Sequence, residues 1–167
     1  YVTAQSLSPP HEHAIIFDEA QRAWDQRQGK KKFDRPASEP LMLLEIMGRH
    51  EDWCALVCLV GGGQEINSGE NGIAGWGEAL RELGPEVARR WTVFGSSQIT
   101  QGDTTTGGLG IGKVPDGMEF KETEDLRLDV PLRSYRSPRV SEWVAAVLDG
   151  HLGRASRIAE DLGDYPI

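Results

Sequence analysis

The sequence predicts an α/β fold with an open, mostly parallel sheet and flanking helices. Three apolar segments lie within the first hundred residues, and segments with helical character separate them. A parallel pair of strands needs a crossover connection, so strands that alternate with helices are typical of such a sheet. The predicted strands cover residues 13–17, 53–60 and 91–97.

The first strand is "HAIIF", and "AQRAWDQRQ" after it is compatible with a short helix. The charged stretch "GKKKFDRP" predicts an exposed loop. Ser38 and Pro40 resemble a helix start, because serine caps helices and proline fits the first turn. The helix that follows, "LMLLEIMGR", is apolar almost all round, so we expect it to be buried on more than one side.

The second strand, "WCALVCLV", is continuously apolar, which predicts a parallel strand covered on both faces. Residues 85–90 then predict a short helix before the third strand. Between the second strand and that helix, four apolar residues recur at helical spacing and predict a further helix: Ile73, Trp76, Leu80 and Leu83.

The polar, glycine-rich run over residues 101–125 predicts a linker or a mobile loop between residues 1–100 and residues 126–167. In the last part, "LRLDVPL" predicts a strand, and "RASRIAEDLG" predicts a final helix with Ile158 and Leu162 inward. Between them lies a predicted helix with Ser137 as its cap, Gly150 as its end and one apolar stripe: Val140, Trp143, Val144, Val147 and Leu148.

Composition excludes some classes of protein. The 167 residues fit one domain, or one domain with a partial second, and no apolar run is long enough to span a bilayer. The net charge of −8 argues against a surface that coats nucleic acid, but it leaves room for a local basic groove. Cys54 and Cys58 are interpreted as buried free thiols, which suits a reducing cytoplasm. Because the chain starts at Tyr1 without a leader, we expect it to be a segment of a longer protein.

Two carboxylates, Asp18 and Glu19, directly follow the first predicted strand. Ligands of open parallel sheets collect at the carboxyl ends of the strands, so this pair is placed to act on a ligand. One carboxylate can hold Mg²⁺ through water while its neighbour activates an attacking water. The alternative is that the pair only opens a helix, where negative charge is favourable.

Two further polar clusters are candidates for the same site. Gln64 and Glu65 follow the second strand after three glycines, and an amide there can sense a terminal phosphate without adding charge. Tyr135 and Arg136 precede the predicted helix at residue 138, where the tyrosine can stack on a base and the arginine can reach a γ-phosphate. The alternative for the first cluster is a glycine-rich turn with a surface glutamine, and the alternative for the second is a pair of surface residues before a capped helix.

In this order, "IIFDEAQRAWD", "LVGGGQEINSGENGI" and "LRSYRSP" resemble the bacterial schlafen-type P-loop proteins with a helicase-like ATPase domain, relatives of superfamily 1 DNA/RNA helicases. The resemblance covers roughly residues 10–150. "FDEAQ" resembles that family's Walker B motif, "GGGQEI" its third helicase motif and "SYRS" its fourth.

The resemblance implies a partial, recombinase-like P-loop NTPase core. Residues 1–100 correspond to the Walker B and third-motif half, and residues 126–167 to the strand and helices of the following helicase-like region. The implied roles are Mg²⁺ binding at Asp18, catalysis at Glu19, γ-phosphate sensing at Gln64 and an arginine finger at Arg136. The implied ligands are Mg²⁺ and ATP, with DNA or RNA as a further partner.

The phosphate-cradling Walker A loop should precede Asp18, and only twelve residues precede His13. A substitute at residues 107–113 fits G-x-x-x-x-G-K, but Val114 and Pro115 follow where the motif needs Ser or Thr and a helix. We therefore expect that ATP and Mg²⁺ binding need a missing upstream half. Without the central strand of that half, the strand that carries Ile15 would expose an apolar edge, which predicts rearranged packing or self-association.

Two other functions stay open. One is a non-catalytic module for protein or nucleic-acid contact, with basic clusters at residues 30–32 and 133–139. The other is a metal-dependent hydrolase or nuclease that uses the carboxylates with His11 and His13, although solvated histidines are the favoured interpretation.

Overall fold

The structure is a computed structural model, and it describes residues 8–61, 69–70, 72–102, 109–127 and 138–162. The chain divides into two compact units, Tyr1–Leu126 and Arg127–Ile167. Each unit is described by itself below.

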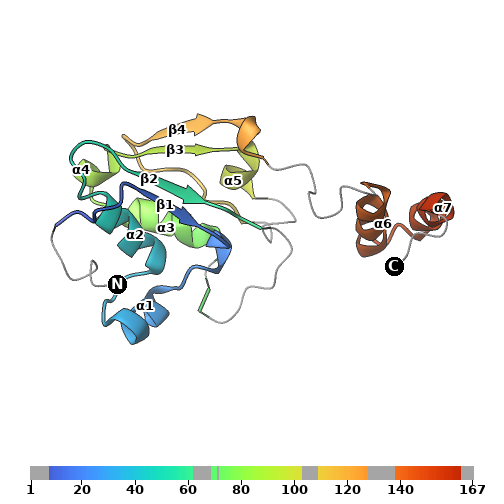
Figure 1. Cartoon of the computed structure of the whole chain (residues 1–167), viewed down its shortest axis with the longest axis horizontal. Coiled ribbons are helices and arrows are strands. Elements are labelled where there is room, and N and C mark those ends of the chain that lie inside the picture. Colours follow the sequence, from blue (N-terminus) through green and yellow to red (C-terminus); the bar gives the residue numbers. More distant parts are fainter. Residues whose placement is uncertain (1–7, 62–68, 71, 103–108, 128–137, 163–167) are drawn as a thin grey trace. The chain divides into compact units, whose positions relative to one another are not determined.

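The first unit holds two pairs of parallel strands. Strand β1 (Ala14–Phe17) pairs with β2 (Ala55–Cys58), and β3 (Thr92–Gly95) pairs with β4 (Glu119–Glu122). In Figure 1 the arrows of all four strands point the same way. The prediction of a mixed α/β fold with parallel strands and helices is confirmed, and the strands form two small sheets.

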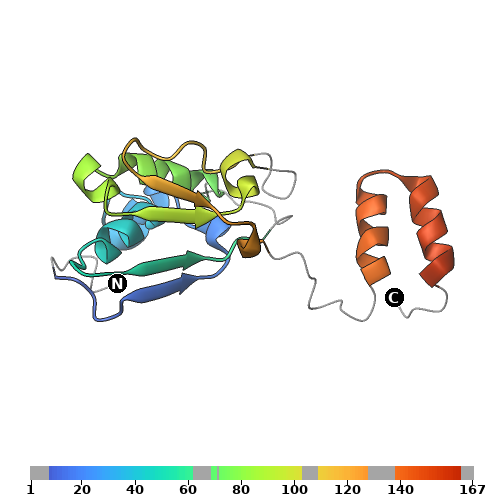
Figure 2. The same cartoon turned by 90° about the horizontal axis from the view of Figure 1, so that it is seen from above.

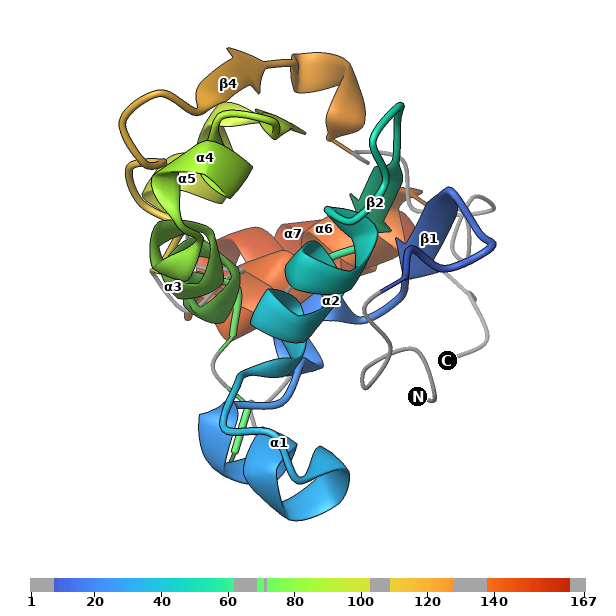
Figure 3. The ribbon, with the colours of Figure 1, turned by 90° about the vertical axis from the view of Figure 1, so that its left-hand side faces the viewer.

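The described part of this unit holds seven helical elements, two of them 3₁₀ turns and five of them α-helices. A 3₁₀ turn, η2 (Ala20–Arg22), follows β1, and a second, η4 (Glu124–Leu126), follows β4. The α-helices are α1 (Gln26–Phe33), α2 (Glu39–Met47), α3 (Ala74–Glu82) and α4 (Pro85–Ala88), with α5 (Ser97–Gln101) directly after β3. Figure 3 shows α1 at a distance from the strands, while α2 and α3 lie beside each other.

Helix α2 forms as predicted. The Ser38 hydroxyl accepts a hydrogen bond from the Leu41 N–H at 3.4 Å, and Pro40 lies in the first turn. Five of its side chains are buried, on more than one side of the helix: Pro40, Leu41, Met42, Leu44 and Met47.

The exposed loop predicted over "GKKKFDRP" is wrong, since most of this stretch belongs to α1. The Asp25 carboxylate caps the helix by accepting from the Gln28 N–H at 2.8 Å. Gly29 is buried in the helix, and a larger residue would not fit there because a Cβ would lie 1.9 Å from the Ala37 carbonyl oxygen. The helix ends at Asp34, which is in the left-handed conformation that stops helices.

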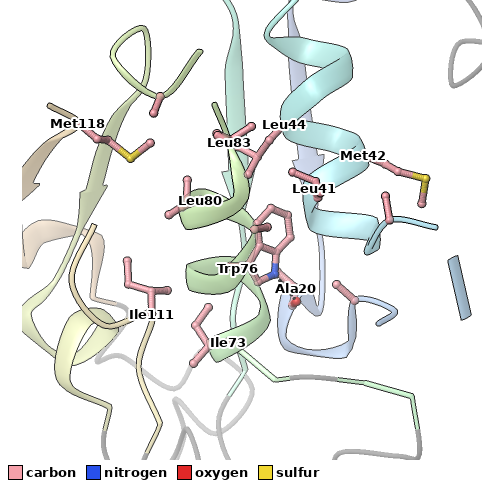
Figure 4. Close-up of a cluster of buried hydrophobic side chains, with 14 residues drawn as sticks. Ala20, Leu41, Met42, Leu44, Ile73, Trp76, Leu80, Leu83, Ile111 and Met118 are labelled. Carbon is pink, nitrogen blue, oxygen red and sulfur yellow. Dashed lines mark hydrogen bonds between the residues drawn. The ribbon is translucent and has the colours of Figure 1, made fainter. Parts of the chain in front are cut away.

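The core of the unit lies between the strands and helices α2 and α3. Trp76 of α3 lies at its centre, with its indole N–H donating to the Ala20 carbonyl at 2.7 Å (Figure 4). Phe17 of β1 meets Trp76 edge to face at a centroid distance of 5.7 Å. Inward residues of all four strands pack against this core: Phe17, Leu56, Cys58, Val93 and Phe120.

The opposite faces of the strands are not covered by the described residues. Ile16 is 71% exposed, Val57 46% and Phe94 56%. The prediction that the second strand is covered on both faces is therefore wrong for the described part of the chain. Apolar composition alone does not distinguish a strand buried on both faces from one with a bare apolar face.

The part of residues 101–125 that the structure describes differs from the predicted linker. Ile111 and Met118 are buried in the core, and β4 pairs with β3. Ile111 packs closely on α3, since a Cβ at Gly77 would lie 1.9 Å from the Ile111 carbonyl oxygen.

The second unit is a helical hairpin of α6 (Pro138–Leu148) and α7 (Leu152–Leu162), seen side by side in Figure 2. Gly150 makes the turn with φ +72°. Ile158 and Leu162 pack inward as predicted. The apolar stripe predicted for α6 is not the buried face of this helix. Ala146 is buried instead, and three residues of the stripe are exposed in this unit: Val144, Val147 and Leu148. The strand predicted for "LRLDVPL" and the Ser137 cap lie almost wholly outside the described residues.

Candidate functional site

The two predicted carboxylates lie at the carboxyl end of β1. Asp18 directly follows Phe17 and is exposed, and one of its carboxylate oxygens accepts a hydrogen bond from the Glu19 N–H at 2.9 Å. Glu19 is half-buried. The inward residues of β1 pack on the core, so Asp18 and Glu19 lie at the edge of the sheet where this strand ends.

The backbone of Glu19 has a conformation that a non-glycine residue seldom adopts. Its φ is 54° and its ψ is 45°, in the left-handed region. Such a conformation persists only where its surroundings fix it. Here the next residue is fixed twice, because the Ala20 N–H donates to the Leu59 carbonyl at 2.8 Å and the Ala20 carbonyl accepts from Trp76.

The side chain of Glu19 is held by Gln21. The Gln21 amide group donates to a Glu19 carboxylate oxygen at 2.7 Å, and its carbonyl oxygen accepts from the Gly61 N–H at 3.1 Å. Gln21 is buried, so both ends of its amide need these partners. Gln21 therefore connects the carboxylate after β1 to the loop after β2.

That loop begins and ends beside the segment after β1. A Cβ at Gly61 would lie 3.8 and 3.9 Å from the two Glu19 carboxylate oxygens. Beyond the undescribed residues 62–68, the Gly69 carbonyl accepts from the Asp25 N–H at 2.8 Å, and Glu70 pairs with Arg22 at 3.3 Å. Gly61 on one side of residues 62–68, and Gly69 and Glu70 on the other, therefore contact residues 21–25.

Among the predicted site residues, the structure brings Asp18 and Glu19 together. Gln64, Glu65, Tyr135 and Arg136 lie outside the described residues, so their roles stay predictions. Sequence reasoning missed Gln21. The available signal was an amide two residues after a carboxylate, in a stretch that turns directly from an apolar strand.

The arrangement can support two kinds of chemistry. The exposed carboxylate of Asp18 offers oxygen ligands at a strand end, the type that Mg²⁺ prefers, so the residue fits a magnesium ion held through water. The Glu19 carboxylate is fixed by a hydrogen bond and by its backbone, which suits a base that has to meet a water in one orientation.

The glycine-rich stretch around Lys113 does not form a phosphate loop in the described residues. The Lys113 side chain is exposed and pairs with Asp116 at 3.0 Å. Residues 109–118 lead into strand β4, whereas a phosphate loop leads into a helix. This agrees with the rejection of residues 107–113 as a Walker A motif.

The first unit is a mixed α/β domain with a candidate site at the edge of the sheet formed by β1 and β2. A carboxylate pair follows β1, and a glycine-rich loop follows β2. Residues 1–167, the whole chain, match the family model described as Schlafen group 3, DNA/RNA helicase domain. The chain therefore belongs to this schlafen helicase-like family, which indicates a helicase-like role related to nucleic acid.

Comparison with curated proteins gives no match, and comparison with solved structures gives none either. In the described part of the chain, every helix is too short or too polar to cross a membrane.

Proposed function

We propose that this chain is the Walker B-to-fourth-motif half of an ATP-hydrolysing, helicase-like domain built on a partial P-loop core. The observation that carries the proposal is the position of Glu19. Its carboxylate is held by Gln21 at the end of β1, close to Gly61, where the loop with Gln64 begins. Membership of the schlafen helicase-like family supports the helicase-like part.

In this proposal Asp18 holds magnesium, which neutralises charge on the phosphates of ATP when bound. Glu19 accepts a proton from the attacking water. The amide of Gln64 contacts the γ-phosphate, Tyr135 stacks on the base, and Arg136 stabilises charge in the transition state. An arginine in that role contributes ~10³–10⁵ in rate.

The proposal requires a phosphate-cradling loop from a segment other than these 167 residues. The only G-x-x-x-x-G-K match in the sequence lacks the Ser or Thr and the helix that the motif needs. We therefore expect the 167-residue chain to hydrolyse ATP poorly or not at all, and the activity to belong to the full-length protein.

The test compares Glu19→Gln with Glu82→Gln in the full-length protein. Glu19→Gln removes the proposed base but keeps the side-chain shape, so ATP hydrolysis should be lost while ATP binding is kept. Glu82 is an exposed glutamate at the end of α3, and its substitution should change neither. If Glu19→Gln hydrolyses ATP at the unmodified rate, the proposal is wrong.

A second candidate function is nucleic-acid binding without catalysis, and α1 is the observation that favours it. The helix carries Arg27, Lys30 and Lys31 as exposed cations and no acidic residue, although the whole chain has a net charge of −8. Lys32 lies over the Trp24 ring at 4.0 Å from its centroid. Exposed cations on one helix suit contacts to phosphate groups.

The test is fluorescence anisotropy with single-stranded DNA and RNA at several salt concentrations. A Lys30→Ala/Lys31→Ala variant should bind more weakly and with a smaller salt slope, by roughly 0.7 per lost phosphate contact. Lys113→Ala, at an exposed lysine on a loop outside α1, is the control. Equal binding by both variants would exclude α1 as the binding surface.

A further inference from the structure

A cluster of metal-binding side chains lies at the amino ends of β1 and β2, away from the carboxylate pair at their carboxyl ends. His13 directly precedes β1, and His50 and Asp52 lie in the turn that leads to β2. Both His11 and His13 were expected to be solvated. His11 is exposed, but His13 is half-buried and contacts the rings of His50 and Trp53.

The three side chains are close enough to share one ion. One ligand atom from each lies within 4.8 Å of the other two. The His13 Nδ1 and an Asp52 carboxylate oxygen are 3.7 Å apart. Two ligands of a tetrahedral Zn²⁺ at bond lengths near 2.1 Å are separated by about 3.4 Å, so a small side-chain rotation brings this pair to bonding distance.

Packing fixes both histidines before any ion binds. His50 is 6% exposed, and its Nε2 forms a hydrogen bond with the Glu12 carbonyl at 3.1 Å. Arg90 donates to the His50 carbonyl and so holds its backbone. The centroid of the His13 ring is 4.1 Å from that of the His50 ring and 4.7 Å from that of the Trp53 ring.

We propose that His13, His50 and Asp52 form a binding site for a Zn²⁺-class divalent transition metal. Two imidazoles and one carboxylate suit zinc and its neighbours far better than magnesium or calcium, which prefer all-oxygen sites. Three protein ligands leave a position for water. The ion would join the amino ends of β1 and β2, and this role does not depend on the proposed ATPase activity.

The competing explanation is a purely structural histidine. The His13 Nδ1 forms a hydrogen bond with the Trp53 carbonyl at 2.8 Å, and a protonated His13 would also pair with Asp52. A metal would have to replace that hydrogen bond. This explanation predicts that metals leave the chain unchanged.

The experiment uses the 167-residue chain after removal of metals with a chelator. Zn²⁺ is titrated by calorimetry, and Co²⁺ by the visible absorption that it gains in a low-coordinate site. Thermal unfolding with and without Zn²⁺ gives a separate readout. The variants are His13→Gln and Asp52→Asn, each with a neighbour as matched control: His11→Gln and Glu51→Gln, both exposed.

The proposal expects one Zn²⁺ per chain and a rise in unfolding temperature of about 5 °C at concentrations 100-fold above the dissociation constant. His13→Gln and Asp52→Asn should each weaken binding at least about 10-fold, while the controls bind normally. Mg²⁺ at the same concentration should give no rise.

Two results would overturn the proposal. The first is that Zn²⁺ does not raise the unfolding temperature and that Co²⁺ gains no visible absorption. The other is an equal loss in His11→Gln and His13→Gln, which would assign the binding to the exposed histidine. Because Asp52 is exposed, its substitution keeps the test decisive even if a histidine variant fails to fold.

Discussion

At the residue scale, Gln21 shows how one buried amide can connect two loops. It contacts the Glu19 carboxylate and the Gly61 N–H, and these residues lie at the ends of neighbouring strands. A buried polar group that loses its partner costs about 1–3 kcal/mol. The orientation of Glu19 is therefore tied to the position of the loop after β2.

We predict that Gln21→Ala lowers the free energy of unfolding by about 1–3 kcal/mol, because it leaves the Gly61 N–H without this acceptor. Urea unfolding followed by circular dichroism measures the loss. Gln101→Ala, at an exposed end of α5, is the control and should stay within about 0.5 kcal/mol of the unmodified chain. Equal stability of the two variants would contradict the role of Gln21.

The two cysteines should differ in reactivity. Burial raises the pKa of the Cys58 thiol from 9.0 to about 12, and it also raises the pKa of Cys54, which is less deeply packed. In a Cys54→Ser variant at pH 8, about one Cys58 thiol in ten thousand is ionised in the folded chain, against about one in ten when unfolded.

Alkylation of Cys58 in that variant should therefore speed up about 1,000-fold on unfolding in urea. The raised pKa of Cys58 also makes the free energy of unfolding depend on pH. The folded chain favours the neutral thiol, so the stabilisation is complete below pH 9 and is lost as the pH rises towards 12. Equal alkylation rates in folded and unfolded chains would show that Cys58 is not buried.

How far the sequence predicts the site depends on the kind of residue. Asp18 and Glu19 follow an apolar strand, and this pattern alone placed them at the sheet edge. The contact of Gln21 with Gly61 and the grouping of His13 with His50 and Asp52 could not be predicted, because these partners lie about forty residues apart along the chain.

At the scale of secondary structure, close packing and not propensity decides where glycine is required. Gly77 in α3 and Gly153 in α7 are both helical glycines, and on propensity alone alanine would stabilise either helix. A Cβ at Gly77 would lie 1.9 Å from the Ile111 carbonyl oxygen, whereas a Cβ at Gly153 would have open space around it.

We predict that Gly77→Ala lowers the unfolding free energy by roughly 1–3 kcal/mol through overpacking. Gly153→Ala should raise the helicity or stability of α7 slightly, by up to about 1 kcal/mol. Thermal unfolding of both variants checks the pair. A stabilised Gly77→Ala would mean that the loop at Ile111 does not pack on α3.

The elements that sequence reasoning missed share a physical cause. Helix α1 has a run of lysines and a central glycine, and both features are typical of loops. The glycine is required by the close contact with Ala37, which the sequence does not show. Strand β4 reads "EFKE", with one apolar residue, and is a strand because it pairs with β3. Elements with a strong apolar pattern, such as α2 and β2, were predicted close to their observed bounds.

At the scale of the whole molecule, an apolar sheet face stays bare in the described residues. We predict that the 167-residue chain self-associates through it or through the edge of β1, since parallel strands are normally covered on both faces. Sedimentation over a wide concentration range should show a rising average mass. Ile16→Lys in β1 should reduce this rise.

The matched control is Leu152→Lys in α7, because Leu152 is 70% exposed and Ile16 is 71% exposed. It should leave the association unchanged. A monomer at all concentrations would contradict the prediction, and so would equal effects of the two substitutions.

The central claim is that Asp18 acts on magnesium-bound ATP, and its most direct test is the Mg²⁺ dependence of ATP binding by the full-length protein. We predict that Mg²⁺ tightens ATP binding and that Asp18→Asn removes most of this gain, while Glu12→Gln, on the exposed approach to β1, keeps it. An Asp18→Asn variant whose ATP affinity responds to Mg²⁺ as the unmodified protein does would contradict the claim.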